Sequence, residues 1–471
     1  MNLVRIGIVI TFCMCSLFAV GCAGGRPTGY FQEENSITTR GGLGENGVFH
    51  DALYGPESIA LNFPGYLIGF DKGRHHAVGK DAKFPVDNKN DQSGLRKVKF
   101  RMIHDPKTHY ISHVMKYEGN FYGVGNCVIY TMYSQWGGDI GNNAGEAPAK
   151  HCLNQDAATG NSVTAQRDSE LALKALSAEL NRAIKLRAEN GKPYTHIIVV
   201  SMGWNTPQVE AVQNFNAIAS HIYAAAVADQ SRYEPLFIGV TWPSIWTSEW
   251  LDPLIRAASY TAKAHDADEV GAIWLADVLD VVRTVAPSDV TLVALGHSFG
   301  ARAMFSAVCG DSVWDGPRPP RKWDVLIGWE GAFSIRRLTT DGAGDGFAYK
   351  EGCLDRAHTV LLTSSIHDSA VTTAFWSDMA GSHKQWNAVC KDQGDASISL
   401  AGPPTTGNPT NCIEADKITY SSVGRIPIEK GKINYLDASN IVFFSHPNTG
   451  GGAHSDIYRR IHGSINWRAM R

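Results

Sequence analysis

Residues 290–309 read VTLVALGHSFGARAMFSAVC, and this stretch decides the fold. It opens with an apolar run at 290–295, turns through Gly296-His297-Ser298-Phe299-Gly300, and passes at once into small and apolar residues at 301–309. A buried strand, a sharp turn and a helix are predicted in that order. A strand that runs directly into a helix is the repeating unit of α/β proteins, so the stretch indicates a parallel sheet covered by helices.

The turn carries a G-x-S-x-G pattern centred on Ser298. A serine hydroxyl stands clear of a strand end only when its own backbone is strained and the flanking strand and helix approach closely. Gly296 and Gly300 remove the side chains that would collide there. In a chain with 47 glycines among 471 residues, the bare pattern arises by chance about 0.3 times. The strand and helix on either side therefore carry the inference that this turn is a nucleophile elbow.

Composition sets the class of protein. The chain is 44% hydrophobic and 10% aromatic, which is enough for the core of one large globular domain or two ordinary ones. A formal net charge of -3 gives no basic surface for nucleic acid and no polycationic patch for anionic lipid. The sequence contains no G-x-x-x-x-G-K-[ST] phosphate loop, no H-E-x-x-H and no paired C-x-x-C, so we expect no cofactor and no metal site.

The first 22 residues are typical of an export signal, because Arg5 precedes an apolar run at 6–20 that is too short to span a bilayer comfortably. The end of this run, Ala19-Val20-Gly21-Cys22, resembles a bacterial lipobox, which implies that Cys22 is lipidated and becomes the mature N-terminus. A plain secretory signal is the alternative. Residues 23–47 are polar and lack an apolar period, so we expect a flexible tether. The predicted location is the bacterial cell envelope, with a lipid-anchored domain in the periplasm or at the cell surface.

Six cysteines remain beyond the signal segment: Cys127, Cys152, Cys309, Cys353, Cys390 and Cys412. An even number in an oxidising compartment predicts disulfides. We expect sequential pairing, because each neighbouring pair is separated by a glycine-rich or proline-rich loop that a covalent link would restrain. Free buried thiols are the alternative.

Apolar runs and helical periods alternate along the rest of the chain. Short apolar runs predict strands at 98–103, 110–117, 127–133, 196–200, 236–241, 325–328, 359–363 and 441–445, and helices are expected from residue 168 to about 190 and from about 260 to 285. This alternation predicts an α/β fold with a doubly wound, mostly parallel sheet and helices on both faces. The domain would span 48–471, with a clear core from about 194. The long connections 334–357 and about 372–436 are typical of lids or binding loops.

A serine nucleophile needs a base, and we expect His454 to supply it. This histidine lies in the glycine-rich segment 451–458, which follows the expected strand 441–445 and has the freedom to reach the sheet. His446 is the alternative, because it directly follows that strand, although Pro447 comes immediately after it.

The base in turn needs a carboxylate that fixes its tautomer. Asp368 lies in the loop directly after the expected strand 359–363, where it could instead cap a helix. Glu330, after the preceding strand, is the alternative acid, or a buried structural one. The resulting order of serine, acid and histidine is the order found in α/β-hydrolases.

An acyl-transfer site also needs two backbone N–H donors for an oxyanion. One comes from the residue after the nucleophile, Phe299. The second is expected from the loop after strand 196–200, where we assign it to the amide of Trp204, with Gly203 as its neighbour; a simple turn is the alternative.

From about residue 194 to the C-terminus the chain resembles an α/β-hydrolase of the serine esterase and lipase type, especially bacterial members. The segments that carry the resemblance are Ser201-Met202-Gly203-Trp204-Asn205, Trp242-Pro243-Ser244 and the elbow. Met202 departs from the pattern, because a histidine commonly precedes the oxyanion glycine. The resemblance implies catalytic roles for Ser298, Asp368 and His454.

We therefore expect an exported serine hydrolase that cleaves carboxylic esters of small molecules or lipids through an acyl-enzyme. Two alternatives remain open. One is an acyltransferase with the same triad, and the other is a non-catalytic envelope lipoprotein that keeps the fold for binding. Five tryptophans could line an acyl pocket or simply fill the core: Trp242, Trp246, Trp250, Trp376 and Trp386.

Overall fold

The computed structural model describes residues 32–33, 60–72, 109–119, 126–131, 152, 158–159, 165–244, 246–247, 260, 263–310, 318–339, 349, 352–371, 378–391, 400, 409–419, 422–445 and 452–471. The expected signal segment with Cys22, most of the tether, the expected strand 98–103 and His446 lie outside the described residues. Among the described helices, none combines the length and the apolar character that crossing a membrane requires.

The described residues form an eleven-stranded sheet. Its strands are β2 (Pro64–Lys72), β3 (His109–Glu118), β4 (Cys127–Thr131), β5 (Ala158–Thr159), β6 (His196–Ser201), β7 (Pro235–Thr241), β9 (Thr291–His297), β10 (Trp323–Trp329), β11 (Ala357–Ser364), β12 (Thr410–Ile413) and β13 (Ile433–Asp437). Their order is β12-β13-β11-β10-β9-β6-β7-β2-β3-β4-β5. Every neighbouring pair is parallel except β2 with β3 and β3 with β4. The expectation of a mostly parallel α/β sheet is therefore confirmed. A separate short pair joins β1 (Gln32–Glu33) to β8 (Trp246–Thr247).

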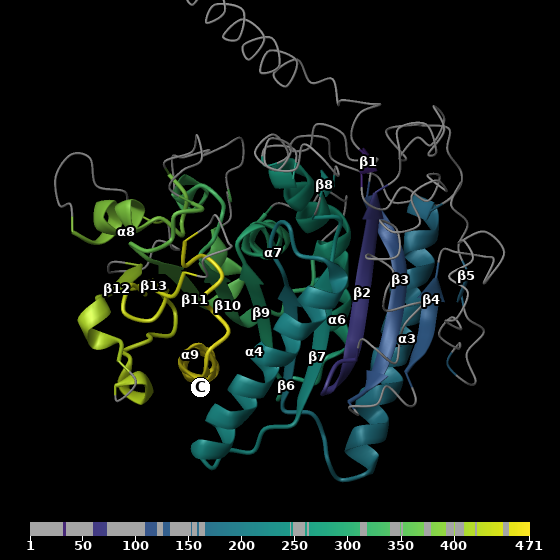
Figure 1. Cartoon of the computed structure of the whole chain (residues 1–471). Helices are drawn as coiled ribbons and strands as arrows, with labels where there is room; N and C mark the ends of the chain where they lie inside the picture. Colours follow the sequence, from purple (N-terminus) through teal and green to yellow (C-terminus); the bar gives the residue numbers. More distant parts are fainter. Residues whose placement is uncertain are drawn as a thin grey trace, which may run out of the picture.

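Helices form two groups against this sheet (Figure 1). The first group is α4 (Gln208–Ala228) and α9 (Arg460–Met470), which pack side by side. The second is α3 (Ala165–Glu189), α6 (Ala276–Val285) and α7 (Phe299–Cys309), in which α6 contacts both of the others. The connection from β6 to β7 runs through α4, and the return from β7 to β9 runs through α6 in the opposite direction. Because such crossovers are right-handed, α4 and α6 cover opposite faces, as a doubly wound sheet requires.

The order in which strands are added to the sheet reverses at β6. This strand pairs with β7 on one side and β9 on the other, and later strands add beyond β9. Parallel strands bring their carboxyl ends to one edge, which is the upper side in Figure 1. At such a reversal the loops on either side diverge and leave a crevice outside the strand ends, where ligands bind in open α/β sheets.

Most expected strands of the sheet exist, but one was misplaced. Segments 110–117, 127–133, 196–200, 236–241, 325–328 and 359–363 correspond to β3, β4, β6, β7, β10 and β11. The expected strand 441–445 is wrong, because these residues form a turn and loop in which Phe443 and Phe444 are exposed. The last strand among the described residues is β13, which begins inside the stretch of about 372–436 that was expected to be a long loop. That stretch also contains α8 (His383–Cys390) and β12, so it contributes to the sheet itself.

The expected helix 260–285 contains a π-helical turn. Residues Gly271–Leu275 form this turn directly before α6, and all five are buried. Gly271 is required by packing, since a Cβ atom there would lie 2.3 Å from the carbonyl oxygen of Ala303 in α7. The turn thus lets α7, the helix that follows Ser298, approach closely.

Three disulfides confirm the sequential pairing. They join Cys127 to Cys152, Cys309 to Cys353, and Cys390 to Cys412. The second links the end of α7 to the segment before β11, and the third links the end of α8 to β12.

Candidate active site

Ser298 stands between β9 and α7 in a strained backbone conformation. Its φ is 56° and its ψ is -124°, a combination that side-chain-bearing residues rarely adopt. The flanking glycines make this turn possible. A Cβ atom at Gly300 would lie 2.2 Å from the Ser201 carbonyl oxygen, and one at Gly296 would lie 2.4 Å from the Gly300 carbonyl oxygen. Neither position accepts even alanine without moving the backbone.

Backbone hydrogen bonds fix the strained residue. The Ser298 N–H donates to the Trp329 carbonyl at 3.0 Å, and the Ser298 carbonyl accepts from Arg302 N and Ala332 N, each at 3.2 Å. Trp329 and Ala332 lie at and beyond the end of β10. The neighbouring strand β10 therefore holds the serine at the carboxyl edge of the sheet, where β9 lies beside β6.

His454 and Asp368 meet although 86 residues separate them. The His454 Nδ1 atom lies 2.7 Å from Asp368 Oδ2, and the Asp368 side chain is completely buried. Asp368 Oδ1 accepts a further hydrogen bond from Ala370 N at 2.9 Å. A carboxylate on Nδ1 selects the tautomer whose Nε2 carries a lone pair, which is the form that can accept a proton.

Two loops are linked through their backbones to make this contact. Asp368 and Gly452 form an antiparallel bridge, and Ala453 N donates to the His367 carbonyl at 2.9 Å. Gly452 has a φ of 63°, and a Cβ atom there would lie 2.6 Å from the His367 carbonyl oxygen. Glycine is therefore the residue that allows the loop of His454 to lie against the loop of Asp368.

His297 ties the same loop to the residue before the nucleophile. Its Nε2–H donates to the His454 carbonyl oxygen at 2.9 Å, and the two imidazole ring centroids are 4.7 Å apart. Burial, followed by the nearby His454 ring, lowers the pKa of His297 to about 3. His297 is thus neutral near pH 7, and His454 lies beside the residue that precedes Ser298. No hydrogen bond joins Ser298 Oγ to His454 within the described residues; such bonds often form only once substrate is bound.

The loop after β6 brings the expected oxyanion residues to the serine. A Cβ atom at Gly203 would lie 2.7 Å from Ser298 Cβ and 3.2 Å from Ser298 Oγ. Among the described residues, no group accepts a hydrogen bond from the backbone N–H of Trp204 or of Phe299. Two free donors beside one hydroxyl are what an oxyanion site requires.

The loop after β7 supports this donor loop. Asn205 has a φ of 59°, and its N–H donates to the Ser244 carbonyl at 3.0 Å. Trp242 Nε1 donates to the Met202 carbonyl at 2.8 Å. Met202, the residue that departs from the family pattern, is itself buried and so belongs to the support of the loop.

Glu330 is the residue whose role the sequence left most open. It follows β10 with a φ of 45°, and its side chain is completely buried. Thr363 Oγ1 accepts from Glu330 N and donates to Glu330 Oε1, both at 3.0 Å. Burial, followed by the adjacent Asp368, raises the pKa of Glu330 well above its usual range. His454 bonds to Asp368, so Glu330 is not its direct partner in this arrangement.

Phe299, the residue after Ser298, belongs to a group of three aromatic rings. Phe299 is 4.8 Å from Tyr260 and 6.4 Å from Trp204 between ring centroids, and Trp204 meets Tyr260 edge-on at 5.7 Å. The sequence did not single out Tyr260, because it comes from a helix far from the motif. Among the five tryptophans, Trp242 and Trp386 are core residues whose Nε1 atoms bond backbone carbonyls. The side chains of Trp246, Trp250 and Trp376 lie outside the described residues.

One buried cluster outside this site has metal-ligand types. Ligand atoms of His109, Asp266 and Glu269 lie within 4.8 Å of one another. His109 Nδ1 is 3.0 Å from Glu269 Oε1, and the ammonium of Lys263 is 3.4 Å from Asp266 Oδ2. Because a lysine cation already neutralises one carboxylate, we interpret the cluster as an ion-pair network. The expected absence of a metal stays a prediction.

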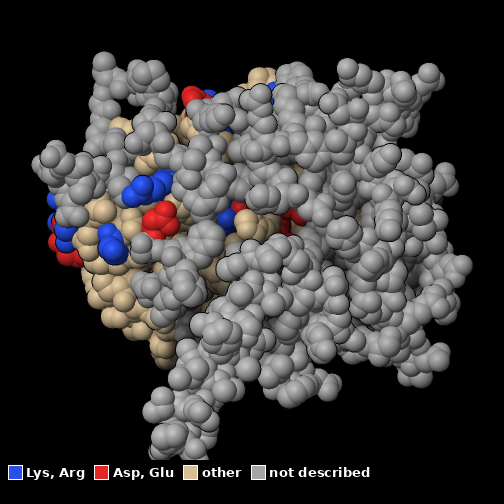
Figure 2. Space-filling model, turned by 90° about the horizontal axis from the view of Figure 1, so that it is seen from above, with Lys and Arg blue, Asp and Glu red and all other residues tan. Residues whose placement is uncertain are grey.

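Figure 2 looks down on the carboxyl edge of the sheet. On its described part, Lys and Arg lie interspersed with Asp and Glu, and no single sign of charge dominates.

Comparisons with known proteins assign no family. No protein-family model matches the chain, and no curated protein sequence matches it significantly. The resemblance to α/β-hydrolases therefore rests on the motif residues and on the arrangement around Ser298.

Proposed function

We propose that the protein is a serine hydrolase that cleaves carboxylic esters through an acyl-enzyme. One observation carries this proposal: a strained serine at the reversal point of a parallel sheet directly follows His297, which bonds to the loop of His454, and His454 Nδ1 is 2.7 Å from a buried aspartate. The free N–H groups of Trp204 and Phe299 support it. Together these groups supply a nucleophile, a base, an orienting acid and oxyanion donors.

The residues act in two half-reactions. Ser298 Oγ attacks the ester carbonyl carbon while its proton passes to His454 Nε2, and the resulting oxyanion accepts hydrogen bonds from the N–H groups of Trp204 and Phe299. The carbon–oxygen bond to the leaving alcohol then breaks, and His454 returns the proton to that oxygen. Water repeats the sequence on the acyl-enzyme and releases the acid. Asp368 stabilises the imidazolium in both halves.

The aromatic group favours an apolar acyl chain. The half-buried rings of Trp204 and Tyr260 pack with the buried ring of Phe299, the residue after Ser298, and Trp204 and Phe299 also carry the proposed oxyanion N–H groups. An acyl chain held against these rings would bring its carbonyl oxygen towards the donors. We therefore propose short to medium aliphatic or aromatic esters as the first substrates to test.

The proposed location is the bacterial cell envelope. Three disulfides support an oxidising compartment, since such bonds rarely persist in the cytosol. We propose that the chain is exported and that Cys22 anchors it to a membrane through lipid. Metabolic labelling with a palmitate analogue tests this anchor, and a Cys22→Ser variant that keeps the label would contradict it.

The test of the nucleophile is covalent labelling by a fluorophosphonate probe. The wild-type protein should become labelled and should hydrolyse p-nitrophenyl esters, whereas Ser298→Ala should do neither. Ser288→Ala is the matched control, because this exposed serine lies just before the start of the same strand, at the opposite edge of the sheet. Labelling that survives in Ser298→Ala would move the nucleophile elsewhere, and a wild-type protein inert in both assays would overturn the proposal.

A further inference from the structure

Two carboxyl groups lie together behind His454. Glu330 and Asp368 are both completely buried, and their side chains are in hydrogen-bonding contact. Glu330 Oε1 accepts a hydrogen bond from Thr363. Glu330 Oε2 is buried and, if the carboxyl were ionised, would meet no donor among the described residues. A carboxylate oxygen in that position is strongly disfavoured unless it carries a proton of its own.

The groups around the two carboxyls can stabilise only one negative charge on the pair. Asp437, at the end of β13, adds a second negative influence on Glu330, although His383 Nε2 pairs with Asp437 Oδ2 at 3.0 Å. Tyr435 also faces the pair from β13, and burial raises its pKa, so it stays neutral. His454 lies within reach of the pair and bonds to Asp368. Because two buried carboxylates in contact cannot both ionise, one proton remains on the pair.

The backbone around Glu330 fixes the position of this residue beside Asp368. Its φ of 45° turns the chain sharply at the end of β10. A Cβ atom at Gly381 would lie 2.6 Å from the Glu330 carbonyl carbon, and Gly381 N donates to the Gly331 carbonyl at 2.9 Å. Backbone conformations of this kind persist only where the surrounding structure over-determines them, and they gather at functional sites.

We propose that Glu330 is a positioning residue whose neutral carboxyl group donates a hydrogen bond from Oε2–H to Asp368. The inference rests on the proposed function, since it assigns Glu330 a task in the same site. Asp368 then accepts from Glu330 Oε2–H in addition to His454 Nδ1–H and the backbone N–H groups of Ala370 and Val371. The Glu330 donor fixes the carboxylate plane and draws part of its charge away from the imidazole.

This arrangement makes a specific prediction for the pH profile. Without the Glu330 donor, the full charge of Asp368 faces His454 and holds a proton on it more tightly. The acidic limb of kcat/KM should then move to higher pH. A hydrogen bond to a charged group is strong enough to shift the midpoint by about one pH unit and to lower kcat about tenfold.

The test compares Glu330→Gln with Glu330→Met in the full-length protein. Gln keeps both an acceptor for Thr363 and a donor for Asp368, so it should hold the wild-type midpoint within about 0.3 pH units and retain most of kcat. Met fills the same volume without a donor and should show the shift and the tenfold loss. Glu429→Met removes an exposed carboxylate and serves as the control for charge alone.

Two results would overturn the inference. An unshifted profile and full kcat in Glu330→Met would show that the donor does nothing. A midpoint that moves to lower pH in Glu330→Gln would show that Glu330 is ionised in the wild-type protein, because Gln would then have removed a negative charge.

Infrared spectroscopy separates this inference from the proposed function. The wild-type protein at pH 7 should show the C=O stretch of a protonated carboxylic acid, which Glu330→Gln removes. An active wild-type protein without that band would overturn the inference. The band in a protein that hydrolyses no ester would leave the protonated pair standing and would overturn the proposed function instead. This measurement also serves if Glu330→Met fails to fold.

Discussion

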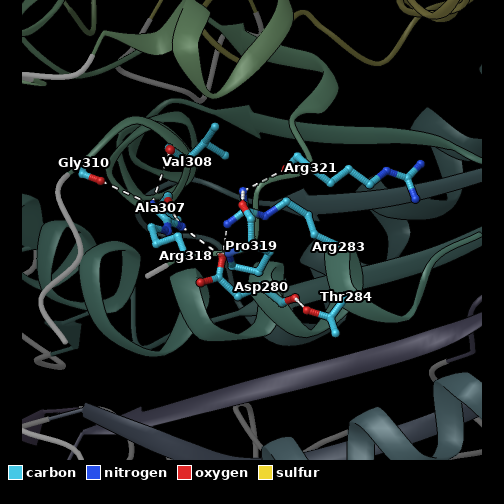
Figure 3. A network of polar contacts seen from close by, with 9 residues as sticks. All are labelled: Asp280, Arg283, Thr284, Ala307, Val308, Gly310, Arg318, Pro319 and Arg321. Atoms are coloured by element: carbon cyan, nitrogen blue, oxygen red, sulfur yellow. Dashed lines mark hydrogen bonds and ion pairs between the residues drawn. The ribbon is translucent and has the colours of Figure 1, made fainter. Parts of the chain in front are cut away.

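The two ends of β9 are built in opposite ways. Around its carboxyl end lie a serine with positive φ, backbone N–H groups that have no acceptor among the described residues, and two carboxyl groups in contact. At its amino end, three arginines satisfy a set of backbone carbonyls (Figure 3): Arg283, Arg318 and Arg321. β9 thus connects a region of backbone strain to a region in which nearly all of the polar groups named are hydrogen-bonded.

The arginines hydrogen-bond to carbonyls at the C-terminal ends of two helices, α7 and α6. Arg318 donates to the carbonyls of Ala307 at 2.6 Å and Gly310 at 3.2 Å, at the end of α7, and also reaches Asp280 in α6. Arg321 donates to the carbonyls of Ala286 and Pro287, each at 2.8 Å, just beyond the end of α6. Carbonyls at helix ends lack partners within the helix and carry partial negative charge, so guanidinium groups suit them well.

The contrast indicates that the amino edge of the sheet serves stability and that the carboxyl edge carries the proposed chemistry. Local rules of backbone conformation and polar satisfaction are followed at the amino edge and broken at the carboxyl edge. Natural proteins tend to break these rules at functional sites and to offset the cost elsewhere. Substitutions at the two edges should therefore fail in different assays.

Asp368→Asn should have the largest effect. The amide favours the wrong histidine tautomer, so kcat should fall by about 10⁴ while the protein stays folded. Ester hydrolysis and urea unfolding of the same sample measure the two effects. A loss of less than tenfold would mean that another acid orients His454.

Arg318→Met should give the reverse pattern. The side chain is almost fully buried and bonds several carbonyls and Asp280, so its loss should lower the free energy of unfolding by about 3 kcal/mol. The kcat should stay within about twofold at a temperature where the variant is folded. Arg232→Met, at an exposed position with one long hydrogen bond, is the matched control. An Arg318→Met protein that is stable but inactive would contradict the division between the edges.

Gly452→Ala should lower both stability and activity, whereas each of the two previous variants lowers mainly one of them. Its Cβ would meet the His367 carbonyl at 2.6 Å in addition to the positive φ, so about 2 kcal/mol of stability and much of kcat should be lost together. Gly431→Ala is the control, because Gly431 has a similar φ with nothing within 4 Å and should lose only about 1 kcal/mol. Equal behaviour of the two variants would show that the contact between the loops is unimportant.

The smallest expected effect is the pH dependence contributed by His297. Its pKa is lowered to about 3 by burial, so its stabilising contribution is present above pH 6.5 and is lost as the pH falls toward 3. At pH 5.5 this single group should cost about 1.4 kcal/mol relative to pH 8. His196 and His462, each with a pKa lowered to about 4 by burial, act in the same direction. His297→Gln should flatten the profile of unfolding free energy against pH, and an unchanged slope would be the contrary result.

Sequence could predict the central strands because they are continuous apolar runs buried on both faces. It failed at β13, whose INYLD sequence includes Asn434. That asparagine is completely buried, and its amide bonds the Glu429 backbone, so a polar residue interrupts the pattern of a core strand. Residues 441–445 mislead in the opposite sense, since Phe443 and Phe444 are apolar but exposed. Tertiary contacts decided both cases.

The residues of the candidate site could be predicted where a local sequence pattern, such as the end of a strand or a glycine-rich loop, marks each of them. Ser298, Asp368 and His454 were identified from local patterns, and His454 and Asp368 do meet. The contact of Glu330 with Asp368 depends on how far β10 and β11 are shifted relative to each other, and this register places Gly328 opposite Leu362. No local pattern specifies that register, so the carboxyl pair could be seen only in three dimensions.

The disulfide between Cys309 and Cys353 bears on how the protein is made. It fastens the far end of the nucleophile's helix to the segment that leads into the strand before Asp368. Thiol oxidation during biogenesis therefore joins the two halves of the site covalently. We expect a reducing expression host to yield a looser, less active product, and an oxidising host with a disulfide isomerase to restore it.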